Sequence, residues 1–138
     1  MALFRKVGRA ALLVHPSGPM PDDDWARIQS QIAALGTPSD EDRMVVWADG
    51  SLNANQRRNA KERNTTGREM KVLMFTNSVV TRGVMQALAW MGMAIKAWPK
   101  ADVDKVLGAE GFSAADVAAV KGAIADMEAE LGVSARAA

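Results

Sequence analysis

The chain has 138 residues, of which 49% are hydrophobic and 24% charged, with a formal net charge of +1 and no cysteine. This composition is typical of a folded globular domain, and the length suits a single core. The small net charge excludes a molecule-wide field that would attract nucleic acid or anionic membranes, and the absence of cysteine excludes disulfides, zinc–thiolate sites and thiol nucleophiles. We expect one domain over residues 1–138, with its core at about 10–131 and a frayed C-terminal tail.

The first half of the chain alternates apolar runs with helical patterns. "AALLVH" and "RMVVWAD" are short apolar runs, which predict two buried strands. Between them, three aspartates precede apolar residues at helical spacing, as at a helix start. The predicted elements are a strand at 10–15, a helix at 22–35, a strand at 43–49, and a helix that Ser51 or Asn53 caps and that ends near Asn64.

The second half continues this alternation. "MKVLMFT" and "AIKAW" predict two further strands, and an apolar helix opened by Asn77 or Ser78 lies between them. The last helix begins with Ser113 and Asp116 at the spacing of a capping box. The predicted elements are strands at 70–76 and 94–98 and helices at 78–93, 101–107 and 113–131. This order predicts an α/β fold with a mainly parallel sheet and right-handed crossovers.

The amino terminus and the apolar runs bear on localisation. The first residues lack the apolar segment and cleavage pattern of a secretory signal. No apolar run approaches the roughly 18 residues that span a bilayer. We therefore expect a cytoplasmic protein that does not act at a membrane.

Motifs of common enzymes are absent from the sequence. It contains neither a glycine-rich dinucleotide motif nor a P-loop, and His15 is its single histidine. The aspartates at 22–24 are neighbours at a predicted helix start, where stabilising the helix is favoured over catalysis. We predict no catalytic residue, no metal site and no cofactor.

Polar residues follow two neighbouring strands of the predicted sheet. In parallel sheets, ligands bind beyond the carboxyl ends of the strands, so these residues define a candidate binding edge. They are Ser51, Asn53, Gln56 and Arg57 after the second predicted strand, and Ser78 and Arg82 after the third. A surface for a protein partner and a small-ligand or anion site, which would hold a nucleotide or phosphate at a helix start, remain open.

The run 57–71 is rich in arginine and lysine. It contains no aromatic residue on which bases could stack, so a solvated helix face is favoured over nucleic-acid binding. In the helix that follows, Trp90 and Met91 extend the apolar character beyond a narrow stripe; core packing is favoured for these side chains, and a partner surface is left open. The apolar helix and the short edge strands invite association. We therefore expect a protein partner, with a second copy of the chain left open, and no nucleic acid.

In their order, these stretches resemble the SpoIIAA-like branch of the STAS superfamily, the domains named for sulfate transporters and anti-sigma-factor antagonists. The similar segments carry an N-x-x-Q-R element, an S-x-x-x-R-G element and a tryptophan near the end of the following helix. These segments are "PDDDW", "VVWADGSLNANQRRNAKE", "VLMFTNSVVTRGVMQALAWMG" and "AIKAWPKADVDKVLG".

The resemblance implies a sheet of four or five mostly parallel strands, with helices packed mainly on one face. It also implies a bacterial regulatory domain that binds a partner and performs no turnover. Antagonist-type STAS domains are switched by phosphorylation of a serine at a helix start, and the matching loop here is "DGSLNAN", with Ser51. The usual D-S-x-G element is absent, and Ser78 offers a second hydroxyl one strand away.

Overall fold

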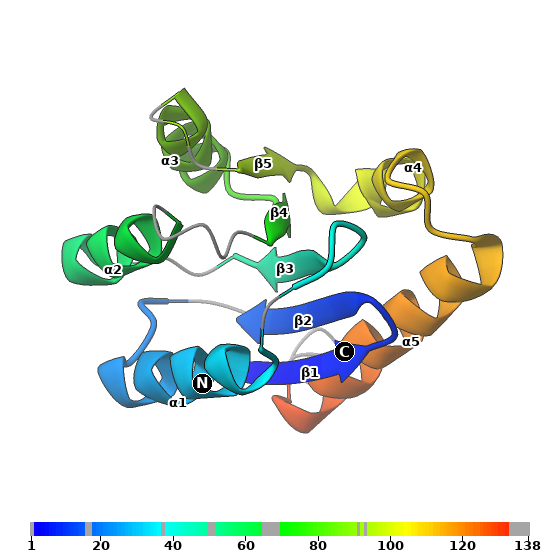
Figure 1. The fold of residues 1–138 in the computed structure, drawn as a ribbon, viewed down its shortest axis with the longest axis horizontal. Helices are drawn as coiled ribbons and strands as arrows, with labels where there is room; N and C mark the ends of the chain where they lie inside the picture. Colours follow the sequence, from blue (N-terminus) through cyan, green and yellow to red (C-terminus); the bar gives the residue numbers. More distant parts are fainter. Residues whose placement is uncertain are drawn as a thin grey trace.

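A computed structural model describes residues 2–15, 18–36, 38–49, 52–64, 70–90, 92 and 94–132, with the side chains of 60–64 left out. It is an α/β structure in which strands and helices alternate for most of the chain (Figure 1). The elements are β1 (Leu3–Val7), β2 (Ala10–His15), α1 (Asp22–Ala34), β3 (Arg43–Ala48), α2 (Ala54–Asn64), β4 (Lys71–Phe75), α3 (Val79–Trp90), β5 (Ile95–Trp98), a 3-10 turn (Lys100–Asp102), α4 (Val103–Ala109) and α5 (Ala114–Glu130).

The sheet has five strands in the order β1-β2-β3-β4-β5. Strands β2 to β5 are parallel, which confirms the predicted mostly parallel sheet, and β1 is antiparallel to β2. Strand β1 was not predicted from the sequence. It is joined to β2 by a tight turn in which Gly8 has a φ of +56°, a conformation that glycine adopts without steric cost.

One face of the sheet packs against α4 and α5. The largest fully buried side chains that the strands contribute to it are Leu12, Leu73 and Phe75, which join Leu107 and Met127 in the main buried cluster. Trp47 and Trp98 flank Phe75, with ring centroids 6.1 and 5.9 Å from it. Their bulk fills this layer near the carboxyl ends of the strands.

The other face packs against α1 and α3. Ile28 of α1 joins Leu13 in one buried cluster, and Met85 of α3 joins Ala48 and Met74 in another. The expected placement of the helices mainly on one face is therefore corrected. Strand β2 is buried at all six positions, because alternate side chains of a central strand point to opposite faces and both faces need a cover.

Helix α2 differs from the other helices in its packing. Its sequence is polar throughout, and Gln56 is its buried side chain among the positions described, 54 to 59. It lies on the same side as α1 and α3 in Figure 1. A polar helix gains little from apolar burial, so its attachment depends on the polar contacts described below.

At the last helix, Ser113 Oγ accepts the backbone N–H of Asp116 at 3.1 Å, which confirms the predicted cap. The expected frayed tail lies at 133–138, outside the described residues. Within the described ranges, no helix is long and apolar enough to cross a membrane.

Candidate functional site

The carboxyl ends of β3, β4 and β5 are tied together by Asp49. Its Oδ1 accepts the Thr76 hydroxyl at 3.1 Å and the Asn77 backbone N–H at 2.9 Å. Its Oδ2 accepts Lys100 Nζ at 2.7 Å, and the Lys100 backbone N–H donates to Asn77 Oδ1 at 3.2 Å. One carboxylate thus fixes the segments that follow three adjacent strands.

The pKa of Asp49 lies below its ordinary value of 3.8. Burial is the largest single influence and raises the pKa, but the bonds from Lys100, Asn77 and Thr76, with the attraction of the Lys100 charge, together outweigh it. The corner at the start of α3 therefore already holds an anion. Its hydroxyl and amide donors are directed to Asp49, which leaves fewer of them for an external phosphate.

Ser78 and Arg82 lie together at the start of α3, as the sequence predicts. Ser78 Oγ accepts the backbone N–H of Thr81 at 3.2 Å, so Ser78 acts as a helix cap. Arg82 Nη1 donates to the carbonyl oxygen of Thr76 at 3.2 Å. The hydroxyl has a structural partner, and the guanidinium is held at the helix start.

Asn53 and Gln56 form a reciprocal cap at the start of α2. The Gln56 N–H donates to Asn53 Oδ1 at 2.8 Å, and the Asn53 N–H donates to Gln56 Oε1 at 3.0 Å. Gln56 Nε2 also donates to the carbonyl oxygen of Met20 at 2.9 Å and to Asp22 Oδ1 at 3.1 Å. Gln56 is 2% exposed, so its expected place on the binding surface is wrong. It links the starts of α1 and α2.

The other polar residues that follow β3 differ in how exposed they are and in what they contact. Arg57 is half-buried and its Nη1 donates to the carbonyl oxygen of Leu52, while Asn53 is exposed. Arg58 is exposed and donates to Asn55 Oδ1 at 3.3 Å. Ser51 lies outside the described residues, so its expected role keeps the status of a prediction.

The outward face of α3 is apolar and exposed. Val79 is 71% exposed, Val80 78% and Trp90 81%. At about 100° per residue these positions fall within an arc of roughly 120° on the helix, together with the exposed Gly83, Gln86 and Ala87. The opposite side carries Met85, which is buried against the sheet. We call the exposed arc, formed by residues 79, 80, 83, 86, 87 and 90, the α3 outer face.

A second polar cluster lies at the opposite edge of the sheet, at the amino ends of β3 and β4. Glu110 accepts Arg43 Nε at 2.9 Å and Lys71 Nζ at 3.0 Å, one on each carboxylate oxygen. Arg9 donates to the carbonyl oxygens of Glu110 at 2.8 Å and Glu41 at 2.6 Å, and its guanidinium lies 4.0 Å from the ring centroid of Phe112.

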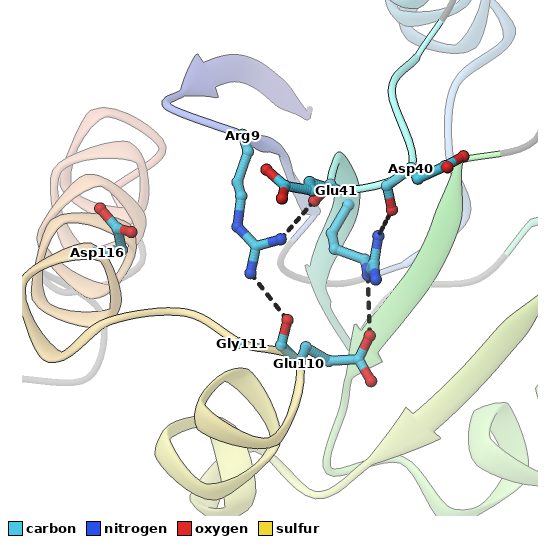
Figure 2. Close-up of a pocket in the computed structure, with 7 residues that line it drawn as sticks. Arg9, Asp40, Glu41, Glu110, Gly111 and Asp116 are labelled. Atoms are coloured by element: carbon cyan, nitrogen blue, oxygen red, sulfur yellow. Dashed lines mark hydrogen bonds and ion pairs between the residues drawn. The ribbon is translucent and has the colours of Figure 1, made fainter.

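This cluster borders an open, polar hollow of about 460 Å³. Figure 2 shows the side chains that line it. Burial of Glu110 raises its pKa and is the largest influence, yet the bonds and charges of Arg43 and Lys71 lower the pKa below the ordinary 4.5. These ion pairs fasten the connection between α4 and α5 to two strand starts. The cluster therefore has a structural role, which the sequence did not reveal.

The single histidine and the grouping of acidic side chains bear on catalysis and on metal binding. His15 is 2% exposed, and its Nε2 lies 3.0 Å from the carbonyl oxygen of Gly18. In the part of the chain that the structure describes, no three His, Asp or Glu side chains gather closely enough to hold a metal ion.

No protein-family model and no curated protein matches the chain. Among solved structures, the chain is similar to an uncharacterised DUF3478-family protein from Shewanella loihica PV-4, which is described as having a SpoIIAA-like fold. The two chains are 13% identical, the match covers 71% of this chain and 84% of that chain, and the TM-score is 0.46.

Proposed function

We propose that this domain is a non-enzymatic regulatory module that binds another protein through the carboxyl edge of its sheet and the α3 outer face. The observation that carries the proposal is the exposure of Val79, Val80 and Trp90 on one side of a helix. Folded domains expose single apolar residues routinely, whereas a contiguous apolar strip marks an interaction surface.

The free energy available from burying these three apolar side chains supports binding to another protein. Burying one large aliphatic or aromatic side chain contributes about 1.5 to 3 kcal/mol, so the three side chains together offer at most roughly 4.5 to 9 kcal/mol. Association costs at least about 4 kcal/mol in lost rigid-body freedom. The α3 outer face can therefore supply a large part of a modest affinity, and polar contacts at the helix starts would add to it.

The ionisable groups of the carboxyl edge support binding over turnover. Asp49 is paired with Lys100 at 2.7 Å and also holds the backbone of Asn77. Its lowered pKa thus has a structural cause, and a catalytic acid or base needs a pKa tuned close to the working pH. The polar residues of this edge serve to hold the helix starts in place.

Site-specific photocrosslinking in the source organism tests the proposal. A photoreactive residue replaces Ala87 in the middle of the α3 outer face, and a matched control replaces the exposed Ala119 of α5, on the other face of the sheet. We expect a crosslink to a distinct protein from position 87 that is absent from position 119. Equal products from both positions, or none from position 87, would contradict the proposal.

A further inference from the structure

Three arginines, Arg57, Arg58 and Arg82, lie near the starts of the two helices that follow β3 and β4, at the carboxyl edge of the sheet. In the described part of the chain, no carboxylate lies within ion-pair distance of Arg57, Arg58 or Arg82, although the side chains of α2 from 60 onward lie outside that part. By contrast, most other described cations are paired: Arg5, Lys6, Arg27, Arg43, Lys71, Lys100 and Lys121 each contact an Asp or Glu. Arg9 also has no carboxylate partner, but two carbonyl oxygens hold its guanidinium at the opposite edge of the sheet. The other three such arginines lie at the carboxyl edge.

The helices themselves add to this positive character. Helix α3 contains Arg82 and no acidic residue, and neither α2 nor α3 has an acid in its first turn. The positive ends of two helix dipoles therefore lie at this edge without an acidic side chain of their own. Two carboxylates lie near these helix starts. The charge of Asp49 is matched by Lys100 at 2.7 Å, and Asp22 Oδ1 accepts Gln56 Nε2 at 3.1 Å at the start of α2. The three arginines outnumber Asp22, so the edge keeps an excess of positive charge.

The shape of the α3 outer face suits a helix. Gly83 and Ala87 lie one turn apart between the two valines and Trp90, and a Cβ on Gly83 would have no atom within 4 Å. Small side chains at these positions let the backbone of a crossing helix approach closely. Arg82 lies about 40° from Gln86 around the helix axis, at the border of the exposed arc.

We propose that the α3 outer face binds an amphipathic helix of another protein, whose apolar stripe is flanked by acidic side chains. This inference rests on the proposed function and specifies the chemistry of its partner. Apolar side chains of the partner would cover Trp90 and Val80, and its carboxylates would pair with Arg82 and with Arg57 or Arg58. Such charge complementarity governs which partner is accepted and how fast it associates.

A second copy of this chain fits the surface less well. A two-fold contact places the same patch on both sides. Each copy would then bring Arg82 to an interface with no acid on either α3. Like charges at an interface are unfavourable, so a different, acidic chain is the better occupant.

Two synthetic helical peptides test the partner's chemistry. They share one leucine stripe, which is flanked by glutamates in the first peptide and by lysines in the second, and their affinity for the full chain is measured by fluorescence anisotropy. We expect the glutamate peptide to bind at least about tenfold more tightly at low salt, with the difference shrinking as salt screens the charges. Equal binding of both peptides, or tighter binding of the lysine peptide, would overturn the inference.

Variants of the chain locate the contact. Trp90→Ala should weaken the glutamate peptide about tenfold or more, and Arg82→Gln about three- to tenfold, whereas Lys105→Gln, at an exposed position of α4, should leave affinity unchanged. An affinity that is insensitive to Trp90→Ala would overturn the inference. A dimer of the peptide-free chain that Trp90→Ala dissociates would also overturn it, in favour of a second copy.

The two proposals fail separately. If position 87 crosslinks to a protein but the glutamate peptide has no advantage, binding at the α3 outer face stands and the acidic partner is wrong. If position 87 yields no crosslink in the source organism, the proposed function fails whatever the peptides do.

Discussion

Arg57 and Arg82 occupy equivalent positions in two successive helices. Each is the fourth residue of its helix, and each donates from Nη1 to a carbonyl oxygen ahead of that helix, of Leu52 for Arg57 and of Thr76 for Arg82. The helices follow adjacent parallel strands, β3 and β4. A guanidinium has five donors, so one bond holds each side chain in place while its positive charge stays available at the edge.

We expect the double variant Arg57→Ala, Arg82→Ala to lose partner capture and to remain folded. Each substitution removes one hydrogen bond to a carbonyl at a partly exposed site, which costs about 0.5 to 1.5 kcal/mol. Urea unfolding measures the stability, and capture from a native extract measures the binding. Full capture by the folded double variant would exclude the arginines from the contact.

Gln56 has a structural role, and its replacement should be costly. Gln56→Ala removes the reciprocal cap with Asn53 and leaves the buried carbonyl oxygen of Met20 without its donor. We expect a loss of about 2 to 4 kcal/mol in the free energy of unfolding, from the cap and the unsatisfied groups together. Urea denaturation measures it. Arg58→Ala, at an exposed position of the same helix, should change it by less than about 0.5 kcal/mol.

If Gln56→Ala were as stable as the wild-type chain, the link between the starts of α1 and α2 would not matter to the fold. A stable variant that had also lost partner capture would return Gln56 to the binding surface.

Glu110 should make the stability of the fold depend on pH in the acidic range. Because its pKa is lowered in the folded state, the carboxylate stabilises the fold above the ordinary value of 4.5, and this contribution is lost as the pH falls through the folded pKa. Glu110→Gln should cost about 1 to 3 kcal/mol at neutral pH. The difference between the two proteins should shrink below pH 4.5, as measured by thermal unfolding at a series of pH values.

A matched control exists on the surface. Asp104 pairs with Lys121 at 3.0 Å, but these side chains are 65% and 49% exposed. Exposed pairs contribute little, so Asp104→Asn should change stability by less than about 0.5 kcal/mol. A constant difference between wild type and Glu110→Gln from neutral to acid pH would contradict the assigned role of Glu110.

Phosphate should show no specific effect at the start of α3. Asp49 takes the Thr76 hydroxyl and the Asn77 N–H, and Thr76 Oγ1 takes the Ser78 N–H, so Arg82 would have to hold a phosphate without these three donors. We therefore expect phosphate to raise the melting temperature equally in the wild-type chain and in Arg82→Ala. The shared rise would come from the general exclusion of this anion from protein surfaces. A larger rise in the wild type would restore the anion-binding alternative.

Local patterns account for what the sequence predicted correctly. Apolar runs such as "MKVLMFT" located the parallel strands, and Ser113 with Asp116 marked a helix start. The same spacing at Asn53 and Gln56 carried a readable signal, because Asn followed three residues later by Gln forms a reciprocal cap. Asn53 is a predicted cap of this helix and is confirmed as one, whereas the part that Gln56 plays in the cap was not predicted.

Long-range contacts explain what the sequence did not show. Glu110 forms ion pairs with Arg43 and Lys71, which lie 67 and 39 residues away in the sequence. No local sequence pattern predicts contacts over such separations. Strand β1 has only five residues with mixed exposure, so its pairing with β2 depends on the adjacent turn. The apolar character of α3 was visible in the sequence, whereas the exposure of Val79 and Val80 required the packed structure.

The most direct measurement is capture of proteins from an extract of the source organism by three tagged chains: wild type, Trp90→Ala and Lys105→Ala. Because Trp90 is 81% exposed, its substitution should leave the free energy of unfolding within about 0.5 kcal/mol of the wild type. We expect one protein that wild type and Lys105→Ala capture and Trp90→Ala does not. Equal capture by all three folded chains would contradict the claim that the α3 outer face binds the partner.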